Sequence, residues 1–191
     1  MDIRQKWFSI RSYMPIPFLF VAIYFGKPNL QSIIFGYIFI LLGESIRLWG
    51  VSVAGSETRT TSKVGGTHLF TDGPFGYVRN PLYIGNIIIF SGSMIAANAF
   101  IPSLPIFAFF FFWIQYRIII SSEENYLQNQ FGLEFESYKK NVPRFIPRFT
   151  KYKGEHSFHR EPEILRGIKS EKRTFQTIII FLFLLILKLY K

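Results

Sequence analysis

The sequence predicts an all-α integral membrane protein, a helical bundle of about five transmembrane helices. Of its 191 residues, 49% are hydrophobic and 19% are aromatic, with 23 Phe, which is more than a soluble domain usually carries. The apolar segments are 13–26, 30–54, 82–100, 102–121 and 174–190. Most of them approach the roughly 20 residues that a helix needs to cross a bilayer.

Local signals justify each segment in turn. Pro15 and Pro17 suit the start of the first helix better than its middle. In the second segment, Glu44 and Arg47 have an i,i+3 spacing and are expected to form an ion pair, with a polar cavity lining as the alternative. The third and fourth segments form a hairpin whose turn, 98–105, holds no charged residue. The last segment is short enough either to span the membrane or to lie along it.

The positions of Lys and Arg predict the topology. With the N-terminus in the cytoplasm, most of the 22 basic residues fall on the cytoplasmic side. Arg47 lies within a span, and only Lys27, Lys188 and Lys191 fall outside. This bias matches the positive-inside rule. The net charge of +10 therefore indicates orientation and attraction to anionic lipid, and no nucleic-acid partner is expected.

Composition also bounds the chemistry and the organisation of the chain. The absence of Cys removes disulfides, thiolate zinc sites and a Cys nucleophile. His156 and His159 lie in a basic polar tail without a surrounding set of carboxylates, so no metal site is expected. The expected units are a membrane domain at 1–147 with a motif core at 66–147, a charged cytoplasmic linker at 148–173 and an apolar helix at 174–191.

Asn80-Pro81 predicts a helix start, because the missing N–H of proline costs nothing in the first turn. The free N–H groups of that turn, with Arg79 nearby, form an anion site that a cofactor carboxylate or phosphate would fit. The alternative is that Gly73-Pro74 only turns a loop and Arg79 anchors a helix at the head groups.

Charged residues at the end of the fourth segment are candidates for chemistry. Glu123 and Glu124 are adjacent, and adjacent helical residues point about 100° apart, so one is expected to face a site and the other to support it or face water. The alternative is a solvated pair that ends a span. Arg117 is a candidate clamp for an anionic head group, or it snorkels to the interface. The aromatic residues near this end form either an interfacial belt or a cofactor pocket: Phe70, Phe75, Tyr77 and Tyr83.

Two motifs separated by the hydrophobic hairpin resemble those of the isoprenylcysteine carboxyl methyltransferase and phospholipid methyltransferase superfamily of integral membrane enzymes. The first family pattern is G-P-Y-x-Y-x-R-H-P-x-Y-x-G, which corresponds here to Gly73 to Gly85. The second is E-E-x-x-L-x-x-x-F-G-x-x-Y-x-x-Y-x-x-x-V-P-x-x-I-P, here Glu123 to Pro147. The resemblance covers about 66–147. This sequence departs from the pattern at Asn80, which replaces His, at Phe75 and Phe135, which replace Tyr, and at Gly76.

The resemblance implies an enzyme that moves a methyl group from S-adenosyl-L-methionine to a lipid-like or prenylated acceptor, such as an isoprenylcysteine-type carboxylate. It also implies a multi-pass membrane protein with its N-terminus and cofactor pocket on the cytoplasmic side, at the inner membrane in a bacterium. Arg117, as a substrate clamp, and Glu124, as a group that could take a proton from an amine acceptor, are the catalytic candidates. The expected cofactor-binding residues are His68, Leu69, Phe70, Arg79, Asn80, Pro81, Tyr83, Glu123 and Glu124.

Two other functions fit parts of the sequence. A membrane reductase of the sterol-reductase type would bind NADPH, but it would need more basic groups for the 2′-phosphate and more core helices. A non-catalytic lipid-binding protein of the same fold is favoured by the change at Asn80. The methyl acceptor stays open among prenylated protein C-termini, phospholipid amines, small thiols and other lipids.

Overall fold

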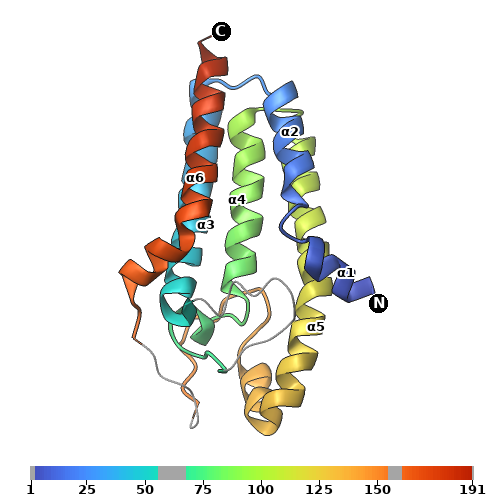
Figure 1. Ribbon diagram of the computed structural model, residues 1–191, viewed down its shortest axis with the longest axis vertical. Helices are drawn as coiled ribbons and strands as arrows, with labels where there is room; N and C mark the ends of the chain where they lie inside the picture. Colours follow the sequence, from blue (N-terminus) through green and yellow to red (C-terminus); the bar gives the residue numbers. More distant parts are fainter. Residues whose placement is uncertain (1–2, 56–67, 155–160, 191) are drawn as a thin grey trace.

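The computed structural model describes residues 3–55, 68–154 and 161–190, in which every regular element is a helix. Figure 1 shows α4 in the middle of an upright bundle, with α3 and α6 on one side and α2 and α5 on the other. The loops gather at the lower end and the C-terminus lies at the upper end. The predicted all-α bundle is therefore confirmed. In chain order the elements are α1 (Ile3–Ile10), α2 (Pro15–Phe25), α3 (Leu30–Ala54), the short 3₁₀ helix η2 (Gly73–Gly76), α4 (Pro81–Ala97), α5 (Ser103–Asn141) and α6 (Ile164–Leu189).

Helices α3 and α4 pack closely because small residues face each other along their contact. A Cβ atom added at Gly43 would lie 2.6 Å from the carbonyl oxygen of Gly85, and one added at Gly92 would lie 2.7 Å from Cβ of Phe39. Small residues allow this close approach of two backbones, which is common between helices in membranes. The contact makes α3 and α4 a rigid centre for the bundle.

Capping residues set where the central helices begin and end. The Asn29 side chain accepts a hydrogen bond from the Ser32 backbone N–H, and the Ser32 hydroxyl accepts one from the Asn29 backbone N–H, so α3 starts with a capping box. Pro81 begins α4, as the sequence predicts. Asn98 ends α4 in the left-handed conformation with φ of 51°, and α5 starts at Ser103. The predicted hairpin is confirmed.

Polar contacts fix α6 to the bundle at two levels. Near its upper end, the Lys188 ammonium donates to the carbonyl oxygens of Ile23, Tyr24 and Gly26 at 2.7, 3.0 and 2.8 Å. These groups lie at the C-terminus of α2, where a cation is favourable. Near its lower end, the Glu171 carboxylate pairs with Arg47 of α3 at 2.7 Å. Arg47 lines the cavity described below.

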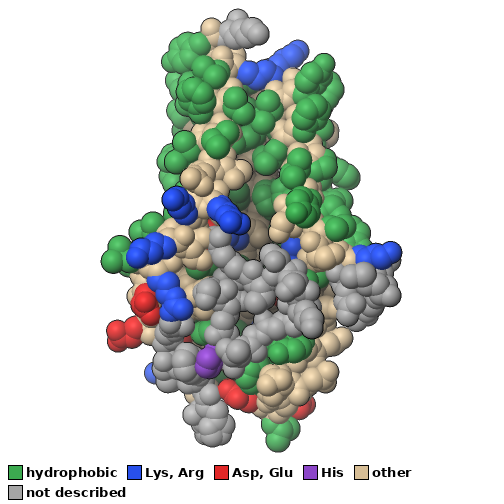
Figure 2. Space-filling view, viewed as in Figure 1, with side chains coloured by type: hydrophobic (Ala, Val, Ile, Leu, Met, Phe, Trp, Pro, Cys, Tyr) green, Lys and Arg blue, Asp and Glu red, His purple; other side chains and the backbone are tan. Residues whose placement is uncertain are grey.

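Within the described residues, two helices, α3 and α5, are long and apolar enough to cross a membrane, and α2 and α4 are shorter apolar helices. Figure 2 shows apolar side chains over the upper half of the molecule and basic side chains in a band across its middle. Apolar surface bounded by charge is typical of a bilayer-embedded protein.

Several boundaries differ from the sequence-based expectation. The fourth apolar segment continues as α5 to Asn141, with a kink at Gly132, where φ is 53°. The acidic pair at 123–124 therefore lies inside a helix and not at its end. Helix α6 begins at Ile164, so part of the expected linker at 148–173 is helical. The short α1 also precedes the first expected segment. Amphipathic stretches such as the start of α6 lack the continuous apolar run by which the spans were recognised.

Candidate functional site

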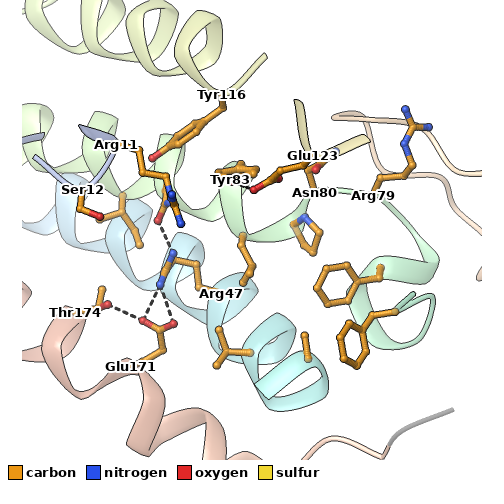
Figure 3. Close-up of a pocket in the computed structure, with 18 of the residues that line it drawn as sticks. Arg11, Ser12, Arg47, Arg79, Asn80, Tyr83, Tyr116, Glu123, Glu171 and Thr174 are labelled. Atoms are coloured by element: carbon orange, nitrogen blue, oxygen red, sulfur yellow. Dashed lines mark hydrogen bonds and ion pairs between the residues drawn. The ribbon is translucent and has the colours of Figure 1, made fainter. Parts of the chain in front are cut away.

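A cavity of about 740 Å³ opens where the lower ends of the helices meet the loops. This volume is in the range of small-molecule sites in proteins. Its walls come from the turn after α1, from α2, α3, α4, α5 and α6, and from the segment at 68–80. Figure 3 shows Thr174 and Glu171 at one end of the cavity, Arg79 and Asn80 at the other, and Tyr83 between them.

Arg79 makes hydrogen bonds to several segments at the loop end of the cavity. Its guanidinium donates to Oε1 of Glu124 from Nε at 3.0 Å and from Nη2 at 2.9 Å. Nη1 donates to the backbone carbonyls of Lys139, at 2.9 Å, and Val142. The Arg79 backbone N–H also donates to the Pro143 carbonyl at 2.9 Å. Arg79 therefore ties the start of α4 to the middle and end of α5.

Glu124 is buried and forms ion pairs with two arginines. Besides Arg79, it accepts hydrogen bonds from Nε of Arg144 at 3.2 Å and from Nη2 of the same residue. The Arg144 carbonyl in turn accepts from the Asn80 side chain at 3.2 Å. Two cations around one carboxylate satisfy its oxygens fully. Glu124 does not line the cavity, so its position is that of an anchor for the loop wall.

Glu123, by contrast, faces the cavity. Its Oε1 accepts a hydrogen bond of 2.6 Å from the Tyr83 hydroxyl, and the Tyr83 ring stacks on Tyr116 with the ring centroids 4.5 Å apart. This places a carboxylate and two aromatic rings at the centre of the cavity. A carboxylate and aromatic faces are both favourable neighbours for an organic cation.

Aromatic and apolar groups line the rest of the loop end. Leu69 is buried, and Phe70 and Phe75 contact each other with ring centroids 6.3 Å apart. The Tyr138 hydroxyl donates to the Phe75 carbonyl at 2.8 Å. Tyr138 lies beyond the α5 kink, and burial raises the pKa of its hydroxyl well above the usual value, so it stays a neutral donor.

An ion pair between α3 and α6 forms the end of the cavity opposite the loops. Nη2 of Arg47 donates to both carboxylate oxygens of Glu171 at 2.7 Å, and Nη1 donates to Oδ1 of Asn86 in α4 at 2.5 Å. The Thr174 hydroxyl adds a 2.6 Å hydrogen bond to Glu171. The expected pair of Glu44 with Arg47 is confirmed at 3.6 Å, and Glu171 adds a shorter contact that the sequence did not predict.

Most of the predicted site residues come together around this cavity. Arg117 does not: its side chain is exposed on α5, with its guanidinium 4.9 Å from the Trp113 ring centroid. It lies outside the cavity lining, which agrees with the snorkelling alternative. Glu124 also lies outside the lining. The predicted residues in the lining are His68, Leu69, Phe70, Arg79, Asn80, Pro81, Tyr83 and Glu123.

Sequence reasoning missed part of the site. Arg144 lies within the second motif but was given no role, although Glu124 needs a partner once it is buried. Arg11, Arg173 and Thr174 line the cavity from α6 and from the turn after α1, where no local signal marks them. Tyr77, expected among the entrance aromatics, instead packs on Trp49 with ring centroids 6.0 Å apart.

Among the described residues, no group of three or more His, Asp or Glu side chains could hold a metal ion. The polar groups of the cavity are arginines, hydroxyls, amides, separate carboxylates and the His68 imidazole. Such a set suits an organic ligand that carries both charges, together with an apolar part.

The fold and the cavity define a helical membrane protein with a polar pocket at one end of the bundle. A family model described as phospholipid methyltransferase matches residues 31–134, which is more than half of the chain. The chain therefore belongs to the phospholipid methyltransferase family, and the resemblance found in the two motifs is confirmed. Helix α6 lies outside the matched region.

Individual relatives agree with this assignment. The chain is 35% identical over 112 residues to the protein-S-isoprenylcysteine O-methyltransferase of Schizosaccharomyces pombe, covering 57% of this chain and 47% of that protein. It is 30% identical over 122 residues to the cobalt-zinc-cadmium resistance protein CzcN of Cupriavidus metallidurans, covering 60% and 50%. Protein-S-isoprenylcysteine O-methyltransferase B of Arabidopsis thaliana is 29% identical over 119 residues, covering 59% and 58%. The chain spans about half the length of these relatives, and no solved structure matches it significantly.

Proposed function

We propose that this protein is an integral membrane methyltransferase that uses S-adenosyl-L-methionine and a lipid-like acceptor. The observation that carries the proposal is the centre of the cavity, where Glu123 accepts a hydrogen bond from Tyr83 and Tyr83 stacks on Tyr116. These residues belong to, or lie beside, the two motifs shared with the family. The donor, when bound, would supply an activated methyl group on a sulfonium cation.

The loop end of the cavity fits such a donor by its chemistry. Glu123 would lie near the cation or accept ribose hydroxyls. Phe70 and Phe75 provide apolar surface for a planar base. The first-turn N–H groups of α4, next to Arg79 and Asn80, suit a carboxylate. Arg79 is held by Glu124, so we assign Glu124 to positioning and not to cofactor contact.

The α6 end of the cavity fits an acceptor with an apolar chain. Ile16, Leu19, Ile89 and Phe90 supply apolar lining from α2 and α4. The polar lining there comes from Arg11, Ser12, Arg47, Asn86, Glu171, Arg173, Thr174 and Thr177, with Arg47 paired to Glu171. Arginine side chains beside an apolar wall favour an anionic head group on a lipid tail. The described residues around this end include no histidine, so an acceptor that is already an anion needs least help from the protein.

These residues would act mainly by alignment. Methyl transfer to an anionic nucleophile needs the two reactants in line and water excluded, and it needs little proton transfer. The aromatic pair Tyr83–Tyr116, at the junction of the two ends, would exclude water there. An orientation with the cavity on the cytoplasmic side follows from the distribution of basic residues.

Calorimetry on detergent-purified protein tests the proposal, with S-adenosyl-L-methionine and NADPH as ligands. We expect binding of S-adenosyl-L-methionine that is lost in Glu123→Ala and kept in Arg117→Ala, the matched control outside the cavity. Binding of NADPH alone would favour the reductase alternative. Binding of neither ligand would favour a non-catalytic lipid-binding protein.

Transfer of a radiolabelled methyl group to two probes then separates acceptor classes. An S-farnesylcysteine derivative carries a carboxylate on a prenyl tail, and phosphatidylethanolamine carries an amine on a lipid. We expect labelling of the carboxylate probe. Labelling of the amine probe alone would keep the methyltransferase and change the acceptor class.

A further inference from the structure

The segment that follows α5 exposes large apolar side chains next to the site. Within residues 145–149, hereafter the 145–149 segment, Ile146 is 79% exposed and Phe149 is fully exposed, at 103%. Two such residues are costly in water so close together, and exposed apolar patches commonly mark interaction surfaces.

Backbone and ring contacts hold the 145–149 segment against the bundle. The Phe145 ring contacts Trp113 of α5 with ring centroids 6.4 Å apart. At its other end, the Arg148 backbone N–H donates to the Tyr77 carbonyl at 2.9 Å, and the Tyr77 ring contacts Trp49 of α3. The segment therefore runs at the level of two tryptophans on two different helices.

The rise of an α-helix gives the position of these tryptophans relative to the bilayer. At about 1.5 Å per residue, Arg117 lies about 21 Å along α5 from its start at Ser103. The α6 segment from Glu171 to Lys188 is about 25 Å long by the same rise. These two lengths, about 21 and 25 Å, are several Å shorter than the roughly 30 Å thickness of a hydrocarbon core, so each covers most of it. Trp113 and Arg117 then lie at the site-side boundary of the bilayer.

This boundary has the composition of a membrane interface. Trp and Tyr are enriched at the head-group level, and Arg extends its charged group from there toward water. Trp49, Tyr77 and Trp113 satisfy the first condition, and the exposed Arg117 satisfies the second. The same layer would take up the Ile146 and Phe149 side chains.

We propose that the 145–149 segment docks into the interfacial layer of the bilayer on the site side, with Ile146 and Phe149 inserted among the lipid head groups and upper acyl chains. The proposal is independent of the reaction catalysed. It also gives the membrane a structural role at the cavity, because Arg144, next to the segment, binds Glu124 and accepts a hydrogen bond from Asn80.

The chain allows a direct test because it contains no cysteine. A spin label is attached at Ile146→Cys and at Phe149→Cys, each in the full chain in vesicles of phosphatidylcholine and phosphatidylglycerol. Collisions with oxygen, which concentrates in the bilayer, are compared with collisions with a water-soluble nickel chelate. Leu133→Cys is the matched control, since Leu133 is 83% exposed and directly follows the kink at Gly132, 16 residues beyond Arg117 in α5.

We expect the labels at 146 and 149 to collide severalfold less with the nickel chelate than the label at 133, and more with oxygen. Equal access of the chelate to all three positions would overturn the proposal. Each variant is first checked by thermal unfolding. If one position does not tolerate its label, the other gives the same comparison. Binding of S-adenosyl-L-methionine is not needed, so failure of the proposed function would leave this result readable.

Discussion

Glu123 and Glu124 are neighbours in α5, yet their carboxylates lie in different surroundings. Glu123 faces the cavity and accepts a hydrogen bond from Tyr83, whereas Glu124 is turned away and binds Arg79 and Arg144. The angle of about 100° between adjacent helical residues produces this division. One carboxylate is therefore accessible from the cavity, and the other holds the loop wall to α4 and α5.

Substitution should separate these two roles. Glu124→Gln removes the charge between two arginines, and we expect the free energy of unfolding to fall by about 2–4 kcal/mol. Glu123→Gln should change stability little and weaken S-adenosyl-L-methionine binding. Thermal unfolding measures the stability of both variants, and calorimetry measures their binding of S-adenosyl-L-methionine. Equal stability of the two variants would contradict the anchor role of Glu124.

The Arg47–Glu171 pair predicts a non-additive double substitution. Glu171 is fully buried, so Glu171→Leu leaves the Arg47 charge without its closest carboxylate and should be strongly destabilising, by about 3 kcal/mol. Replacing both residues, as Arg47→Met with Glu171→Leu, removes both charges and should cost less than the sum of the single changes. A double-mutant cycle by chemical unfolding measures the difference. Simple additivity would mean that α6 docks without this pair.

The glycine contact between α3 and α4 predicts a position that tolerates no side chain. Gly43→Val would place Cβ 2.6 Å from the Gly85 carbonyl oxygen, so the helices must separate and the bundle should lose stability. Leu42→Ala is the matched control on the exposed face of the same helix, and its effect should be small. Thermal unfolding in detergent compares the two, and the prediction is wrong if Leu42→Ala is the more damaging.

Asn80 replaces the His of the family pattern, and its hydrogen bond explains how the change is accommodated. The Asn80 amide donates to the Arg144 carbonyl at 3.2 Å, a bond that an imidazole N–H can also make. We expect Asn80→His to keep cofactor affinity, and Asn80→Ala to reduce it modestly by loosening the loop wall. Calorimetry with S-adenosyl-L-methionine checks both. A large loss in Asn80→His would show that this pocket is specific to the amide.

Features encoded over short stretches of sequence were predicted well. The start of α4 at Pro81, the turn after Asn98 and the pairing of Glu44 with Arg47 depend on neighbouring residues, and all were expected. The grouping of both motifs at one cavity followed from the hairpin that connects them. One glutamate was expected to face a site and the other to support it or face water, and Glu123 lines the cavity whereas Glu124 binds two arginines outside the lining.

Features that depend on distant packing were not predictable. Glu171 is one charge among many in a polar stretch, and only the docking of α6 on α3 brings it to Arg47. The length of α5 was missed because its second half is amphipathic and not apolar. Arg117 was expected either to clamp a head group or to snorkel, and only the rotation of α5, which directs it outward, separates the two.

The two polar attachments of α6 also fix how thick a membrane the bundle can accept. Lys188 is bound to α2 and Glu171 to α3, so the helical stretch between them, about 25 Å at the rise of an α-helix, cannot slide relative to its neighbours. In a thicker bilayer this bundle must tilt or thin the lipid around it, at the cost of hydrophobic mismatch. A protein built this way is expected to favour membranes with short or disordered acyl chains.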